Sequence, residues 1–170
     1  MTMTVGRAYL AQAQTDFTSD AWLKAAGQPC SQWLHFLQRA LEKTGKAYLA
    51  ASGSELPQLR QSHLAMGRFL RILARNTMIW QQWPLAPRQF QQHVGRLLPL
   101  VDAIERLTPA LSTGPNVEYP WQLPDGRLVA PCQYGFHEVL TDLETVNGRN
   151  LLKIVERALH NPSWQTAFGM

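Results

Sequence analysis

The sequence predicts an all-α protein: an up-and-down helical bundle of four core helices, followed by a proline-rich flap or small hairpin and by one or two C-terminal helices. Two observations lead to this prediction. Apolar residues recur at steps of three and four over long stretches, as on the buried face of an amphipathic helix. Prolines fall between these stretches or gather in residues 109–134, where they exclude a long helix. The 170 residues, 45% hydrophobic and 16% charged, suit a single domain with a core over 5–108, the flap over 109–134 and a helical segment over 135–160.

The first two helices are predicted over about 5–26, ending at Gly27, and over 31–51. The second lies within SQWLHFLQRALEKTGKAYLAAS, and leucines at helical spacing form its apolar face: Leu34, Leu37 and Leu41. The opposite face is predicted to meet solvent or a partner, and it carries His35, Arg39, Glu42 and Lys46. Glu42 precedes Lys46 by one helical turn, a pairing that supports a helix by roughly 0.2–0.5 kcal/mol.

The third and fourth helices are predicted over 57–76 and 87–108, separated by the interruption WQQWPLAP. Pro57 and Pro87 suit the first turn of a helix, where the missing backbone donor is not needed. Apolar residues at steps of three and four then continue through both stretches, so each is expected to bury one face.

The flap and the C-terminal segment are predicted from their turn residues. YPWQLPDGRLVAP places Pro-Asp-Gly between two short apolar stretches, which favours a small hairpin or an extended flap. Tyr119 and Trp121 are expected to anchor it on the bundle, although they could instead be presented to a ligand. Asn147-Gly148 is a candidate break between two helices within 135–160.

The net charge of +4 is concentrated in the middle of the chain, where residues 57–106 hold seven arginines and two acidic residues. If 57–76 is one helix at about 100° per residue, four arginines lie within about 80° of one another. These are Arg60, Arg68, Arg71 and Arg75. An arginine face of this kind can bind the phosphates of RNA. Alternatively, the arginines are solvated, or they pair with acidic groups of a second copy of the chain.

Several classes of function lack their sequence signals. No apolar run reaches the roughly 18–20 residues of a membrane span, and the N-terminal stretch lacks the order of a signal peptide, so we expect a cytoplasmic protein without membrane contact. Cys30 and Cys132 have no metal-binding spacing, so we expect free, buried thiols and no metal site. The chain has no glycine-rich phosphate loop and no acidic cluster for Mg²⁺, and we expect no cofactor.

A long first helix ending in Gly-Gln-Pro-Cys, followed by HFLQRALEKTGKAYL, resembles the HEPN superfamily. Its second helix typically carries a Glu-Lys-x-x-Lys-Ala pattern, which here is formed by Glu42, Lys43, Lys46 and Ala47. The likeness is strongest to uncharacterised bacterial HEPN-like proteins in which segments like PNVEYPW and GRNLL follow the core. The core resemblance covers roughly 5–106, and the tail extends it to about 160.

The resemblance implies a bundle that is commonly dimeric, in a superfamily of metal-independent ribonucleases and non-catalytic binding modules. Its catalytic members carry Arg, four to six further residues and then His. The His moves a proton at the ribose 2′-OH or the leaving oxygen, and the Arg stabilises charge on the phosphate. Arg88 and His93 in RQFQQH have this spacing, which chance also supplies in a chain of this composition. A second start, Arg75-Asn76, has Trp80 where the His would stand.

The sequence leaves three functions open. The first is an HEPN-like protein acting by association in a bacterial defence or toxin-antitoxin system, as a homodimer or beside a protein partner such as a nucleotidyltransferase antitoxin. The second is a metal-independent endoribonuclease that uses Arg88 and His93. The third is a non-cleaving RNA-binding module that uses the arginines of the third helix, Arg60, Arg68, Arg71 and Arg75.

Overall fold

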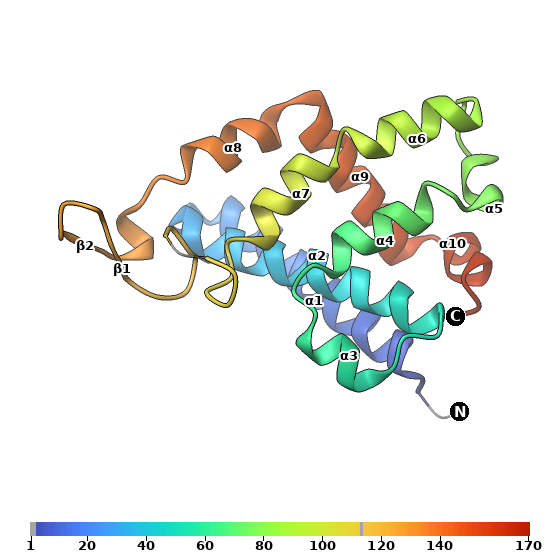
Figure 1. Ribbon diagram of the computed structural model, residues 1–170, viewed down its shortest axis with the longest axis horizontal. Coiled ribbons are helices and arrows are strands. Elements are labelled where there is room, and N and C mark those ends of the chain that lie inside the picture. The colour runs from blue at the N-terminus through green and yellow to red at the C-terminus, as the bar shows by residue number, and fades with distance from the viewer. Residues whose placement is uncertain (1–2, 113) are drawn as a thin grey trace.

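The structure, a computed structural model, describes residues 3–112 and 114–170 and confirms the predicted all-α class. It is a helical bundle with one two-stranded hairpin, which projects from one end of the molecule (Figure 1). The short helices α5 (Thr77–Trp80) and α10 (Pro162–Ala167) lie toward the opposite end. Within the described residues, no helix combines the length and apolar character that crossing a membrane requires.

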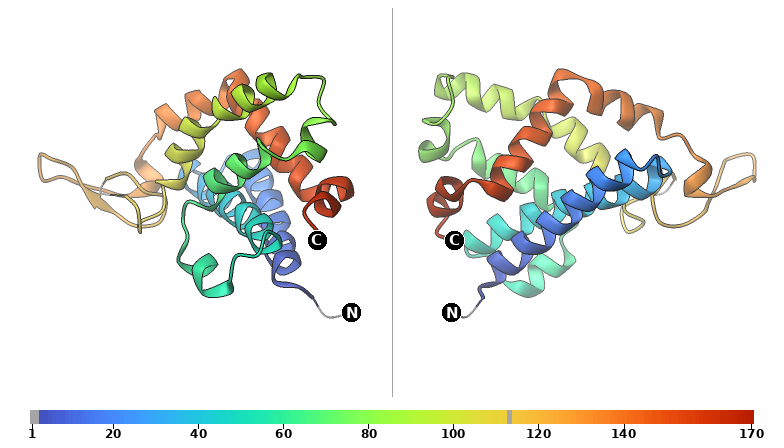
Figure 2. Two further views of the ribbon diagram at one scale, coloured as in Figure 1. Left: turned by 45° about the vertical axis from the view of Figure 1, so that its right-hand side comes forward. Right: turned by 180° about the vertical axis from the view of Figure 1, so that it is seen from behind.

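Helices α1 (Val5–Ala25) and α2 (Cys30–Ala51) form an antiparallel hairpin through the centre of the molecule, as the two views of Figure 2 show. The Thr4 hydroxyl caps α1 by accepting a hydrogen bond from the Arg7 amide at 3.3 Å. Gly27, with φ of 68°, adopts the left-handed conformation that ends this helix. The bounds of both helices agree closely with the prediction because each boundary is marked by local capping or turn residues.

The predicted third helix, 57–76, is wrong as a single element. The chain forms α3 (Leu56–Gln61) and α4 (Ala65–Leu73), with Ser62 extended between them. Leu59 of α3 is buried in a small cluster with Leu49 and Ala65, so α3 folds back against the end of α2. The break therefore lets the two halves bury apolar side chains in different directions.

Helix α4 crosses α2 where the two backbones meet at Gly45. A Cβ atom at Gly45 would lie 2.5 Å from the carbonyl oxygen of Ala65 and 2.5 Å from the Met66 amide nitrogen. No side chain fits there without separating the helices, so the glycine inside an otherwise strong helix has a packing role.

The predicted fourth helix, 87–108, is also divided, into α6 (Pro87–Gly95) and α7 (Leu98–Glu105). Pro99 stands in the first turn of α7 and has no backbone N–H to continue the hydrogen bonds of α6. Helix α5 leads into the interruption WQQWPLAP, and the Asn76 side chain caps it by accepting hydrogen bonds from the amides of Met78 and Ile79.

The proline-rich segment forms the predicted hairpin. Strands β1 (Trp121–Gln122) and β2 (Leu128–Val129) pair antiparallel, with Trp121 opposite Val129. A 3-10 turn (Pro131–Gln133) follows. Trp121 is only 8% exposed and meets Tyr134 edge to face at 5.1 Å, which confirms its anchoring role. Tyr119 is 60% exposed, so the prediction that it also anchors the flap is wrong.

The C-terminal segment divides into α8 (His137–Glu144) and α9 (Val146–His160), followed by α10, which the sequence did not predict. The break falls at Thr145, slightly before the predicted Asn147-Gly148, because the Thr145 hydroxyl caps α9 by accepting from the Gly148 amide at 3.2 Å. Helix α10 closes the core: its Trp164 is fully buried. The Tyr48 hydroxyl donates to the Ala158 carbonyl at 2.6 Å and ties α2 to α9.

Candidate functional site

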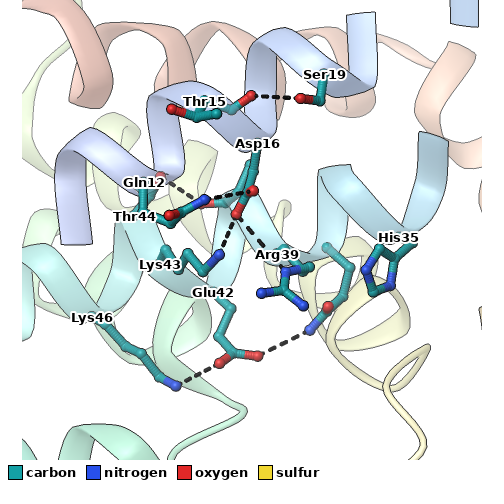
Figure 3. A network of polar contacts seen from close by, with 12 residues as sticks. Gln12, Thr15, Asp16, Ser19, His35, Arg39, Glu42, Lys43, Thr44 and Lys46 are labelled. Atoms are coloured by element: carbon teal, nitrogen blue, oxygen red, sulfur yellow. Dashed lines mark hydrogen bonds and ion pairs between the residues drawn. The ribbon is translucent and has the colours of Figure 1, made fainter. Parts of the chain in front are cut away.

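The charged face of α2 forms a largely internal network (Figure 3): Arg39 is exposed, as predicted, whereas Glu42 and Lys46 are half-buried or buried. Lys43 donates to the buried carboxylate of Asp16 on α1, with 2.5 Å between Nζ and Oδ2. Gln12 donates to the other oxygen of Asp16 at 3.1 Å, and Arg39 lies 4.0 Å from Oδ2. The network therefore joins α1 to α2 through a carboxylate that water barely reaches.

Glu42 forms the second centre of this network. Its carboxylate accepts hydrogen bonds from Gln38 at 3.1 Å and Lys46 at 2.5 Å, and His63 lies 3.5 Å away. Burial raises the pKa of Glu42, but the bonds and charges of Lys46, Gln38 and His63 outweigh burial and lower this pKa below its ordinary value. Lys46 is itself buried, so the prediction that it faces solvent or a partner is wrong. Within the HEPN-like pattern, Glu42 and Lys46 thus pair with each other, while Lys43 pairs with Asp16 of α1.

A third buried carboxylate, Glu105 at the end of α7, caps α4. Its Oε1 atom accepts hydrogen bonds from the backbone amides of Met66 at 2.8 Å and Gly67 at 3.2 Å. Burial raises the pKa of Glu105 to about 7, and these two bonds oppose the rise. Because it holds the first turn of α4, Glu105 positions the helix that carries most of the predicted RNA-binding arginines.

Three of those arginines are exposed on or just after α4. Arg68 and Arg71 lie on the helix, about 60° apart around its axis at ~100° per residue, and Arg75 follows the end of the helix. Within the described part of the chain, no carboxylate lies within 4.0 Å of their guanidinium nitrogens. We call these three residues the α4 arginine face.

Arg60 does not belong to this face. It is exposed on α3, and the break at Ser62 removes the continuous helix on which its alignment with the other arginines depended. The predicted set of four therefore reduces to Arg68 and Arg71 on α4, with Arg75 just beyond the end of that helix.

Arg88 and His93 lie on α6 but do not converge. They are five residues apart, so their side chains point about 140° apart around the helix axis. Arg88 is exposed, whereas His93 is half-buried beside Trp83, with 5.8 Å between the ring centroids. Burial, and then the charge of Arg96, lower the pKa of His93, and its Nε2 atom is enclosed without a partner among the described residues.

The structure brings a different arginine to the surroundings of His93. The Arg157 guanidinium of α9 lies 4.6 Å from the centroid of the Trp83 ring, which His93 also contacts. No sequence signal indicates this cluster, since α9 is distant in the chain and WQQWPLAP predicts only an interruption between helices. The alternative start, Arg75-Asn76, uses its asparagine to cap α5.

Within residues 3–112 and 114–170, no three His, Cys, Asp or Glu side chains gather as metal ligands. Both cysteines are free thiols. The prediction that they are buried is wrong: Cys30 is half-buried, with its thiol 3.3 Å from the Tyr134 carbonyl, and Cys132 is exposed.

Comparison with protein-family models, with curated proteins and with solved structures finds no match for this chain, so its HEPN resemblance stays an expectation based on the pattern in α2.

Proposed function

We propose that the protein acts by association, as a non-cleaving HEPN-like subunit of a bacterial defence or toxin-antitoxin complex, and that it binds RNA through the α4 arginine face. The single observation that carries the RNA contact is the set of three exposed arginines without a carboxylate partner on or just after α4. RNA phosphates are the partners that such a surface attracts, because each contact also releases condensed counterions.

Some exposed arginines are neutralised by a neighbouring carboxylate, whereas others, such as Arg88 and Arg96, have no such partner among the described residues. Arg106 pairs with Asp102 at 2.8 Å and Arg127 pairs with Asp125 at 2.7 Å. Three like charges held on or just after one short helix repel one another, and a polyanion relieves that repulsion. The α4 arginine face therefore has the charge and the accessibility that an RNA backbone requires.

The alternative function is a metal-independent endoribonuclease that uses Arg88 and His93. Their divergence on α6 means that a homodimer would have to supply the second residue of each pair. The enclosed Nε2 of His93 also argues against proton transfer from that atom. RNA cleavage that survives EDTA and disappears in His93→Ala, with the fold intact, would replace our proposal with this one.

The test of RNA binding is retention of a labelled single-stranded RNA at low salt. Arg68→Glu with Arg71→Glu should abolish retention, because two contacts become repulsive. The matched control, Arg7→Glu with Arg127→Glu, changes the net charge equally on exposed residues of α1 and the hairpin, and should retain RNA. No retention by the native chain, or equal loss in the control, would overturn the RNA contact.

Association has its own test. Sedimentation of the purified chain and of a preparation from its native host should give a homodimer or a complex with a protein partner. A strictly monomeric chain without a co-purifying partner would contradict association even if RNA binding is found. The genes beside this one add a second check, since a neighbouring nucleotidyltransferase would favour the toxin-antitoxin setting.

A further inference from the structure

A small cavity lies where α1, α2, α8 and α9 meet, away from the α4 arginine face. Its volume is about 120 Å³. The buried Trp33 ring of α2 and leucines of α8 and α9, among them Leu143 and Leu152, form apolar walls. Charged residues complete the lining: Asp20 and Lys24 of α1, and the exposed Glu144 of α8. The cavity is thus apolar along its length and carries carboxylates.

Asp20 is the feature that requires an explanation. It is only 9% exposed, and its Oδ1 atom is buried with no hydrogen-bond partner among the described residues. The other buried carboxylates of the fold are all satisfied: Asp16 by Lys43, and Glu105 by two backbone amides. Burial raises the pKa of Asp20 to about 6 and the nearby charge of Lys24 partly opposes the rise, so near neutral pH the group is mostly ionised although its Oδ1 atom has no hydrogen-bond donor within the described part of the chain.

Trp33 shows which kind of group the cavity attracts. The ammonium of Lys24 lies 4.8 Å from the centroid of its ring, a cation–π distance. Lys24 stands one turn after Asp20 on α1, yet it forms no ion pair with it within 4.0 Å. A cation of this chain therefore sits at the aromatic wall, while the carboxylate beside it remains open.

We propose that this cavity binds a primary alkylammonium group, with its nitrogen between the Asp20 carboxylate and the Trp33 ring and its carbon stem against the leucines. A primary ammonium supplies the hydrogen-bond donors that Asp20 lacks, and the ring stabilises the same charge. The volume of about 120 Å³ is large enough for a short alkyl chain and too small for a large ligand. Lys24 is the resident competitor that the ligand displaces from the ring.

Other ligand classes fit the cavity less well. An anion would meet the carboxylates of Asp20 and Glu144. A neutral apolar molecule would leave Asp20 buried and unpaired, which disfavours its binding. The ammonium group has two sources of the same chemistry, a free alkylamine or the lysine side chain of a peptide, and both belong in the test.

The experiment is a titration of the folded chain with n-butylammonium chloride, followed by the NMR signal of the Trp33 indole N–H. We expect saturable shifts, and no such shifts with 1-butanol, which has the same stem but no charge. Asp20→Asn should weaken binding by roughly tenfold or more, since a charge-assisted hydrogen bond is lost. Lys24→Met should tighten binding because it removes the competitor while keeping an apolar stem, and Lys153→Met, an exposed lysine of α9, is the matched control.

The outcomes separate cleanly. Any one of three results would overturn the proposal and leave a cavity that holds water only. These are equal shifts with 1-butanol, unchanged affinity in Asp20→Asn, and no shift at millimolar amine in either the native chain or Lys24→Met. Thermal unfolding checks that each variant is folded, and Lys24→Met keeps the test decisive because its side chain is exposed. Binding of a blocked lysine amide as tightly as butylammonium identifies a peptide side chain as a suitable ligand, whereas binding of butylammonium alone identifies a free amine.

Discussion

Lys43 of α2 and Asp16 of α1 form an ion pair inside the fold, with 2.5 Å between Nζ and Oδ2. The Asp16 side chain is only 4% exposed and the Lys43 side chain 15%. The lysine of the HEPN-like pattern is thus a structural residue of the α1–α2 hairpin, since its charge is used to neutralise a buried carboxylate.

Lys43→Met should therefore destabilise the protein. Removing one partner of a buried ion pair typically costs 3–5 kcal/mol, and we expect roughly 2–3 kcal/mol because Arg39 and Gln12 remain beside Asp16. Urea unfolding measures the change. Arg106→Met is the matched control, because it breaks an exposed pair and should leave the free energy of unfolding nearly unchanged. Equal losses in the two variants would contradict a buried role for Lys43.

Gly45→Ala should disrupt the crossing of α2 and α4. The added methyl group would meet backbone atoms of Ala65 and Met66, which cannot rotate away, so we expect a loss of roughly 2 kcal/mol or more in the free energy of unfolding. Gly95→Ala on α6 is the control: nothing lies within 4 Å of its added Cβ, and helix propensity predicts a gain of up to about 1 kcal/mol. A neutral Gly45→Ala, measured by thermal or urea unfolding, would show that the helices do not touch there.

The sequence predicted those parts of the fold whose signals are local. The α1–α2 hairpin follows from capping, a turn glycine and apolar periodicity, and the β-hairpin follows from Pro-Asp-Gly. The break between α3 and α4 has no comparable local signal. It depends on Glu105, far along the chain, which caps α4, and on the close approach of Ala65 to Gly45.

The candidate site was predictable to the same extent. Arg68 and Arg71 share one side of α4, with Arg75 just beyond the end of that helix, and periodicity is enough to place the first two. The predicted alignment of Arg60 with the other arginines is wrong because the helix that carries Arg60 ends at Gln61. Trp83 contacts both His93 and Arg157. Arg157 is distant from the other two in the chain, so this cluster depends on the tertiary fold and has no local sequence signal.

Glu105→Gln should change how stability depends on pH. The pKa of Glu105 is about 7 in the fold, above the ordinary 4.5, so the folded state holds this proton more tightly than the unfolded state. The stabilisation that protonated Glu105 gives the folded state is fully present below about pH 4.5. It is lost as the pH rises through about 7, which lowers the free energy of unfolding by on the order of 2–3 kcal/mol. Glutamine keeps an acceptor for the two amides of α4 and does not ionise. The variant should therefore lack this loss.

Urea unfolding of both proteins between about pH 5 and about pH 8 measures this effect. The difference between the two curves isolates Glu105, because His35 and His93, whose pKa values burial lowers, contribute equally to both. Glu138→Gln, an exposed acid on α8, should give a curve parallel to that of the native chain. If the curve for Glu105→Gln is also parallel, the buried carboxylate does not titrate in this range.

Neutral substitutions on the α4 arginine face should lower the salt dependence of RNA binding. Each phosphate contact with a single strand contributes about 0.7 to the slope of log affinity against log salt concentration, so Arg68→Gln with Arg71→Gln should reduce the slope by about 1.4. Arg127→Gln should leave it unchanged, because Asp125 already neutralises that arginine on the hairpin. Fluorescence anisotropy at several salt concentrations gives both slopes. A weakened affinity with an unchanged slope would mean that the two arginines support the fold near the RNA and do not contact its phosphates.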